Sequence, residues 1–230
     1  MRWPFTLLLA LAAGFAGSAL WHVSGLGGDA TRDYLLAHPE VLPEAMQVLQ
    51  QRDMAARIDP VRGELEQPFP GAVLGNPDGT VTLVEFSDYA CSFCRQSLAD
   101  VERLVAANPD LKVVIREYPI LRAESVDAAR MALAAAQQGR YAAFHEAMFR
   151  LGPPSAETIA AAARDAGVDL AQAEQAIATG AFDTHLRSNA MLADRLGITG
   201  TPGWVIGDEA LAGAVGAETI GQAIARARAS

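Results

Sequence analysis

The chain has 230 residues, of which 51% are hydrophobic and 20% charged, so it can bury a core and wholesale disorder is excluded. Its net charge of −9 gives no general attraction to phosphate backbones, which argues against nucleic acid as a partner. The only two cysteines, Cys91 and Cys94, exclude a fold stapled by several disulfides and a four-cysteine zinc site.

Residues 1–26 have the layout of an export signal. One positive charge, at Arg2, precedes an uncharged apolar run. Gly17 and Ala19 offer small residues for cleavage, whereas an uncleaved run of about 20 residues is long enough to anchor the chain in a bilayer. Both alternatives predict an exported body, either soluble or tethered to the membrane.

Residues 27–58 predict two short helices that are separated near His38 and Pro39, because the residue before a proline disfavours the α region. Leucine or alanine recurs every seven residues at positions 35, 42, 49 and 56. Two helices this short cannot bury such a stripe against themselves. We therefore predict homo-oligomerisation through residues 29–58, with an intramolecular helical arm as the alternative.

Residues 59–71 contain three prolines and two glycines and predict an extended linker. The pattern changes at residue 72. Apolar and β-branched runs predict strands at residues 72–74, 80–86 and 111–118. A helix at residues 91–107 lies between the last two strands, and this order indicates a βαβ unit.

The remainder of the chain, from about residue 122, is first helical and then mixed. Residues 122–196 are alanine-rich and predict a helical insertion with breaks at glycines and prolines. A short hairpin at residues 204–211 and a helix at residues 217–227 follow. The predicted fold class is therefore α/β, with a domain at residues 72–230 whose small sheet is interrupted by helices.

Cys91 and Cys94 directly follow a central strand and open a helix. The free N–H groups at a helix N-terminus stabilise an anion, so the pKa of Cys91 is expected to fall. Its thiolate can attack a disulfide, and Cys94, one turn further on and facing inward, can resolve the mixed disulfide. A disulfide across so short a loop stabilises a fold little. Half a metal site and a pair of buried core thiols are the alternatives.

Glu85 shares a strand face with Val81 and Leu83, which points its carboxyl towards the core. Loss of solvent there raises a carboxyl pKa, and such a group can move protons for the inward cysteine. A salt-bridged or solvated carboxylate at the end of the strand is the alternative.

Several other side chains are weighed for a role near the cysteines. Asp88 and Tyr89 are expected to shape the turn between strand and helix. Phe93 and Trp204 either contact apolar substrate segments or pack ordinarily. His145 lies on the apolar face of a helix and is interpreted as a structural polar residue. The histidines have no paired ligand spacing, so neither a resident metal nor another cofactor is predicted.

Two stretches, VEFSDYACSFC at residues 84–94 and GTPGWVIG at residues 200–207, resemble the DsbA-like branch of the thioredoxin superfamily. The helical insertion between them fits too, so the resemblance covers about residues 72–230. It implies a thioredoxin fold. The positions that it assigns are the nucleophile Cys91, the resolving thiol Cys94, the buried acid Glu85 and, lining the substrate groove, Thr201 with a cis Pro202.

The stretch HPEVL at residues 38–42 resembles the N-terminal oligomerisation segment of the suppressor-of-copper-sensitivity protein C family, whose members include trimeric disulfide isomerases. In contrast, Ser92 and Phe93 stand where DsbA has a proline and a histidine. One source of thiolate stabilisation is thus missing, and a milder redox poise suits an isomerase or a reductase.

Together these features predict a periplasmic thiol–disulfide oxidoreductase that forms, isomerises or reduces disulfides in client proteins. A membrane redox partner is expected to reset its cysteine pair. The alternative function is a copper(I)-binding or copper-tolerance protein that uses the reduced pair.

Overall fold

The structure is a computed structural model that describes residues 3–23 and 28–229, with side chains over residues 10–21 and 31–229. The chain divides into two compact units, residues 1–50 and residues 51–230. The expected export segment, residues 1–26, lies partly outside the described residues.

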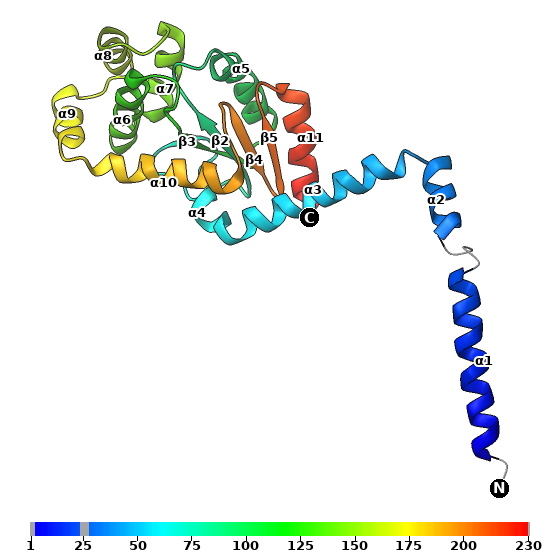
Figure 1. The fold of residues 1–230 in the computed structure, drawn as a ribbon. Coiled ribbons are helices and arrows are strands. Elements are labelled where there is room, and N and C mark those ends of the chain that lie inside the picture. Colours follow the sequence, from blue (N-terminus) through cyan, green and yellow to red (C-terminus); the bar gives the residue numbers. More distant parts are fainter. Residues whose placement is uncertain (1–2, 24–27, 230) are drawn as a thin grey trace. The chain divides into compact units, whose positions relative to one another are not determined.

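The first unit is helical (Figure 1). It holds α1 (Trp3–Val23), α2 (Gly28–Ala37) and the first part of α3 (Val41–Ile58). The break between α2 and α3 falls at His38 and Pro39, as predicted. No helix in the described part of the chain is both long enough and apolar enough to cross a membrane.

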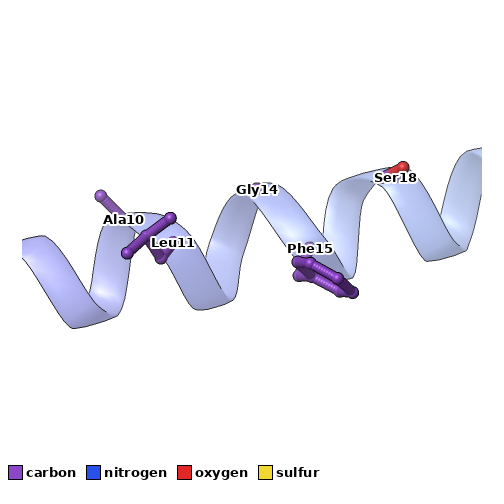
Figure 2. A pocket seen from close by; sticks show the side chains of 5 residues that line it. All are labelled: Ala10, Leu11, Gly14, Phe15 and Ser18. Atoms are coloured by element: carbon purple, nitrogen blue, oxygen red, sulfur yellow. The ribbon is translucent and has the colours of Figure 1, made fainter.

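Most of the apolar side chains that the structure describes in the first unit are exposed to solvent. Leu42, Met46 and Leu49 on α3 are each more than half exposed, at 52%, 56% and 53%. Along α1, Ala10, Leu11, Gly14, Phe15 and Ser18 line a shallow hollow, which Figure 2 shows to run beside a single helix. These five residues include no titratable group, so the hollow offers no acid–base chemistry.

The second unit is built on a five-stranded sheet with the strand order β1-β3-β2-β4-β5. Strands β2 and β3 run parallel, and the other neighbouring pairs run antiparallel. The strands are β1 (Val73–Gly75), β2 (Val81–Ser87), β3 (Leu111–Glu117), β4 (Gly203–Ile206) and β5 (Glu209–Ala212). The βαβ unit and the hairpin predicted from the sequence are both present.

The helices of this unit flank the sheet and form the insertion (Figure 1). They are α5 (Ser92–Ala107), α6 (Ala123–Gln137), α7 (Tyr141–Leu151), α8 (Ala156–Asp165), α9 (Leu170–Ala178), α10 (Ala181–Leu196) and α11 (Gly216–Ala229). Helices α6 to α10 lie between β3 and β4 in the chain, as predicted for the insertion. Helix α6 is the most enclosed and buries Ala128, Ala129, Ala132, Ala134, Ala135 and Ala136.

Alternation of side chains along β2 gives the sheet two distinct faces. Val81 and Leu83 join the larger core, which α5, α6, α7 and α11 cover. Val84 and Phe86 point the other way and join a second core with residues of α10. Glu85 shares the face of Val81 and Leu83, so it projects into the larger core, as the alternation predicted.

Residues 59–71 are not an extended linker, which corrects the sequence prediction. They form a 3₁₀ turn (Asp59–Val61) and helix α4 (Arg62–Glu66) before the chain extends. Val61 and Leu65 are buried in the second core together with Ile58. The prolines and charged residues of this segment indicated a linker, although Val61 and Leu65 between them are apolar. Burial of these two side chains holds the segment against the sheet.

Candidate functional site

The turn between β2 and α5 is held by Asp88. Its backbone carbonyl accepts from the N–H of Cys91 at 2.9 Å, and its Oδ1 accepts from the N–H of Ala90 at 2.8 Å. Its Oδ2 accepts from the N–H groups of Ile120 and Leu121 at 2.8 and 2.9 Å. The carboxylate therefore joins this turn to the segment after β3, as expected for a residue that shapes the turn.

Cys91 caps the N-terminus of α5. Its Sγ accepts from the N–H of Cys94 at 3.4 Å, and its thiol lies 3.2 Å from the carbonyl oxygen of Thr201, to which it can donate. The peptide bond between Thr201 and Pro202 is cis, as the family resemblance implied. Both cysteines are free thiols. The structure thus brings together four of the predicted site residues, although the two cysteines lie more than a hundred positions before Thr201 and Pro202 in the chain.

Cys94 faces the interior and is 1% exposed. Burial raises the pKa of its thiol, and the charge of Glu85 raises it further. Glu85 is 3% exposed, and burial raises its pKa to about 8. The two groups are therefore electrostatically coupled, and each favours the protonated form at neutral pH.

The Ser87 hydroxyl is a polar neighbour of both groups. It lowers the pKa of Glu85 and that of Cys94. Among the described residues, however, its Oγ has no hydrogen-bond partner of acceptable geometry, so we treat it as a nearby dipole and not as a bonded group. Ser87 is 2% exposed, which makes this unpaired hydroxyl a feature of the buried site.

A second buried polar group, missed by the sequence reasoning, lies on the same face of the sheet. The Glu117 carboxyl, at the end of β3, accepts from the hydroxyls of Tyr89 and Tyr141, and the Tyr89 hydroxyl also meets the ring of His145. Burial raises the pKa of Glu117 to about 8 and lowers that of His145 to about 3. One signal for Glu117 was available in the sequence. Pairing the two predicted parallel strands in register places Glu117 beside Ser87, close to the cysteines.

The remaining side chains that were considered differ in burial and in partners. Trp204 is fully buried, and its indole N–H donates to the carbonyl of Gly213 at 2.9 Å, so it packs in the core and does not line a substrate surface. Phe93, beside Cys91, is 57% exposed. His145 is buried and hydrogen-bonded, in keeping with a structural polar residue. No cluster of three or more metal-ligating side chains occurs among the described residues.

The sheet has this topology, two cysteines open the helix after its central strand, and a loop with a cis proline lies against the first thiol. These features together define a thioredoxin-fold protein with a redox-type cysteine pair. The chain belongs to the DSBA-like thioredoxin domain family, whose model matches residues 82–225. Residues 28–56 also match the model described as the copper resistance protein ScsC N-terminal domain. The predicted fold and both resemblances are confirmed.

Solved structures agree with this assignment. A thioredoxin-like oxidoreductase from Silicibacter pomeroyi is 42% identical, with a TM-score of 0.66 over 69% of this chain and 92% of that one. The thiol-disulfide exchange protein alpha-DsbA2 from Wolbachia pipientis is 25% identical, with a TM-score of 0.71 over 77% and 97%. Proteus mirabilis ScsC in a compact conformation is 26% identical, with a TM-score of 0.61 over 81% and 96%.

Curated relatives match over a shorter stretch. The Na(+)/H(+) antiporter NhaA 1 of Mycolicibacterium gilvum is 42% identical over 72 residues, which are 30% of this chain and 12% of the antiporter. The chain thus spans about an eighth of the length of that relative. The family model and the solved structures, in contrast, cover most of the chain, and they agree on the DSBA-like thioredoxin domain family.

Proposed function

We propose that this protein exchanges disulfides with the cysteines of client proteins, with Cys91 as the nucleophile and Cys94 as the resolving thiol. The observation that carries the proposal is the position of the Cys91 sulfur. It caps α5, accepts from the N–H of Cys94 and lies 3.2 Å from the Thr201 carbonyl. A helix N-terminus favours the thiolate, which is the attacking form.

The first step joins the protein to its client. The Cys91 thiolate attacks one sulfur of a client disulfide, a new bond forms between them, and the other client sulfur leaves as a thiolate. The loop at Thr201 and Pro202 lies against Cys91 and supplies backbone groups to an extended client segment. Phe93, exposed at the start of α5, adds apolar contact area.

The second step releases the client. Cys94 loses its proton to the ionised form of Glu85, which is the minor form at neutral pH, and attacks Cys91. A bond forms between the two cysteines, the bond from Cys91 to the client breaks, and the client sulfur leaves with the electron pair. Glu85 suits this transfer because burial raises its pKa to about 8, close to physiological pH. When the protein oxidises a client, the same steps run in reverse.

Substitution of the resolving thiol tests this chemistry. Cys94→Ser in the full chain is expected to accumulate mixed disulfides between Cys91 and client proteins, detected as adducts that a reductant removes. Cys91→Ala is the matched control and is expected to trap none. Equal trapping by both variants, or none by either, contradicts the assignment of roles.

We further propose that the protein is an oligomeric isomerase or reductase and not a strong oxidant. The exposed apolar residues Leu42, Met46 and Leu49 and the match of residues 28–56 to the ScsC N-terminal domain support association through residues 29–58. Ser92 and Phe93 between the cysteines support a milder poise. A reduction potential measured against glutathione, with the mass from light scattering, tests both. A strongly oxidising potential in a monomer overturns the proposal.

Export to the periplasm, and reset of the cysteine pair by a membrane redox partner, complete this proposal. The charge and apolar pattern of residues 1–26 support it. Fractionation of cells that express the full chain, followed by alkylation of free thiols, checks the location and the redox state together. Recovery of the protein in the cytoplasmic fraction contradicts export.

A copper(I)-binding role is the second candidate, favoured by the description of the ScsC N-terminal domain as part of a copper resistance protein. Two thiolates can hold copper(I). Burial opposes this at Cys94, because the raised pKa of that thiol keeps it protonated. Loss of copper binding in Cys94→Ser without any trapped client supports the copper role over the enzymatic one.

A further inference from the structure

A pocket of about 160 Å³ lies between α5, α7 and β1, and we call it the α5–α7 pocket. Its apolar wall is formed by Leu74 of β1 and by Leu98, Val101 and Val105 of α5. A cavity of about 150 Å³ holds a molecule the size of benzene, so this pocket has room for a side chain or a small organic molecule. Neither cysteine lines it, although α5 begins beside Cys91. The pocket is therefore separate from the dithiol.

His145 of α7 brings a polar atom to this pocket. The residue lines the pocket and is 2% exposed. Its Nδ1 lies 3.0 Å from the Tyr89 oxygen, and since the two ring nitrogens point away from each other, Nε2 faces away from Tyr89. Nε2 forms no hydrogen bond with the described residues, and it is not one of their fully enclosed, unpartnered side-chain atoms. This nitrogen of a buried ring is thus open to the pocket that the ring lines.

The hydrogen bonds on the inner side of the ring determine the state of Nε2. The hydroxyls of Tyr89 and Tyr141 both donate to Oε1 of Glu117, at 3.1 and 2.8 Å. Because the single hydroxyl proton of Tyr89 is used there, the contact between Tyr89 and His145 requires a proton on Nδ1. Burial lowers the pKa of His145 to about 3, so the neutral ring carries only that proton. Nε2 is therefore a hydrogen-bond acceptor.

Two carboxylates give the same pocket a negative charge. Glu102 of α5 and Glu146 of α7 line it and are exposed. Among the described residues, neither carboxylate has an ion-pair or hydrogen-bond partner, and no lysine or arginine lines the pocket. These carboxylates and His145 do not form a cluster that could hold a metal ion, again within the described part of the chain. The pocket thus favours a cation that donates hydrogen bonds and has an apolar part of its own.

We propose that the α5–α7 pocket binds a primary ammonium group on a short aliphatic stem. One N–H of the ammonium group donates to Nε2 of His145, the carboxylates of Glu102 and Glu146 offset its charge, and the stem lies against the apolar wall. A lysine side chain of another protein and a free alkyl amine share this chemistry. The site goes beyond the proposed function, because it uses neither cysteine.

Titration of the full chain with n-butylammonium chloride tests the site, since this probe has the four carbons and the ammonium group of a lysine side chain. The readout is the ¹⁵N resonance of His145 Nε2, which moves when a bare nitrogen accepts a hydrogen bond. We expect saturation with a dissociation constant on the order of millimolar. Neutral n-butanol should bind at least about tenfold more weakly. Equal binding of n-butanol, or the same shift with ammonium chloride, overturns the proposal.

A substitution at the exposed edge of the pocket tests its position without disturbing the core. Ala142 lines the pocket and is exposed on α7, so Ala142→Leu fills the space and is expected to weaken binding at least about tenfold. Ala143→Leu is the matched control, because Ala143 is also exposed but does not line the pocket. Unchanged binding in Ala142→Leu, or equal weakening by both variants, overturns the site.

Removal of the negative charge tests the choice of a cation. The double variant Glu102→Gln, Glu146→Gln is expected to bind n-butylammonium about tenfold more weakly than wild type. Glu174→Gln, which removes an exposed carboxylate on α9, is the control and should have no effect. If the double variant binds as wild type does, the proposal is wrong.

Two further measurements identify the source of the amine and separate this site from the dithiol. A short peptide with one lysine that binds more tightly than n-butylammonium indicates a protein partner, and one that binds more weakly indicates a free amine. Cys91→Ala should bind n-butylammonium as wild type does. Failure of that variant to trap or exchange disulfides therefore bears on the proposed function alone, whereas loss of amine binding in the wild type bears on this site alone.

Discussion

Two consecutive residues at the end of β3 place a guanidinium and a carboxyl group on opposite faces of the sheet. Arg116 enters the second core, and Glu117 enters the larger one. The Arg116 guanidinium donates to the backbone carbonyls of Glu64, Leu65 and Gln67 and to the Asn189 side chain. The Glu117 carboxyl accepts from two tyrosine hydroxyls instead. Both groups are almost fully buried, yet their partners differ in kind.

The difference lies in whether a proton can move. Burial lowers the pKa of Arg116 to about 10, so it stays charged at neutral pH, and carbonyl oxygens have no proton to give back. Glu117, whose pKa burial raises to about 8, is bonded to hydroxyls that both donate and accept. One face of the sheet thus uses a buried charge to fasten the chain, and the other holds titratable groups next to a thiol.

The largest effect is expected from Arg116→Met. This change leaves the buried carbonyl of Leu65, and the partly buried carbonyls of Glu64 and Gln67, without the donor that Arg116 supplies, so we expect a loss of about 4 kcal/mol in the free energy of unfolding, at every pH from 5 to 9. Denaturant titration measures it.

Arg150→Met is the matched control for that change, because Arg150 forms an exposed ion pair with Asp165, and it should cost less than about 1 kcal/mol. A similar cost for the two variants contradicts a fastening role for Arg116.

A smaller effect, with a distinct pH dependence, is expected from Glu85→Gln. The folded pKa of Glu85, about 8, lies above its ordinary value of 4.5, so the folded state binds the extra proton between these values. The wild type therefore loses stability as the pH rises from about 4.5 to about 8, and the variant does not. We expect the variant to gain on the order of 2 kcal/mol relative to wild type by pH 9. Denaturant titrations at pH 4, 7 and 9 show whether the gap opens.

The smallest effect is expected from Ser87→Ala. Removal of an unpaired buried hydroxyl should change the free energy of unfolding by less than about 1 kcal/mol. Since this hydroxyl lowers the pKa of Glu85 and that of Cys94, both values should rise in the variant. Thiol alkylation rates and carboxyl NMR titration report the two shifts.

Ser97→Ala provides the comparison for that variant. The Ser97 hydroxyl is buried but donates to the Phe93 carbonyl at 3.0 Å, so its removal should cost about 1 kcal/mol and leave both pKa values in place. If the two serine variants behave alike, Ser87 has no special relation to the cysteine site.

The sequence predicted the features of the second unit that have local causes. Hydrophobic periodicity within a few residues was enough to predict strand β2, the helix after Cys91 and the inward direction of Glu85. Helix α4 was not predicted, and its contacts with Arg116 left no trace in the sequence. Arg116 binds main-chain carbonyls in and after this helix, and such carbonyls are present whatever the side chains are. Glu117 was missed because its partners, Tyr89 and Tyr141, come from other elements, and a single strand pattern does not reveal them.

The buried alanines of helix α6 limit which substitutions the helical insertion can accept. Six alanines with no side chain beyond Cβ are buried along it, so neighbouring helices approach its backbone closely. An added methyl or larger group at Ala132 or Ala135 must displace a whole helix, while truncation is possible only to glycine, which weakens the helix itself. Substitutions within the insertion will therefore be tolerated on its exposed surface, whereas the buried alanines of α6 will tolerate the fewest.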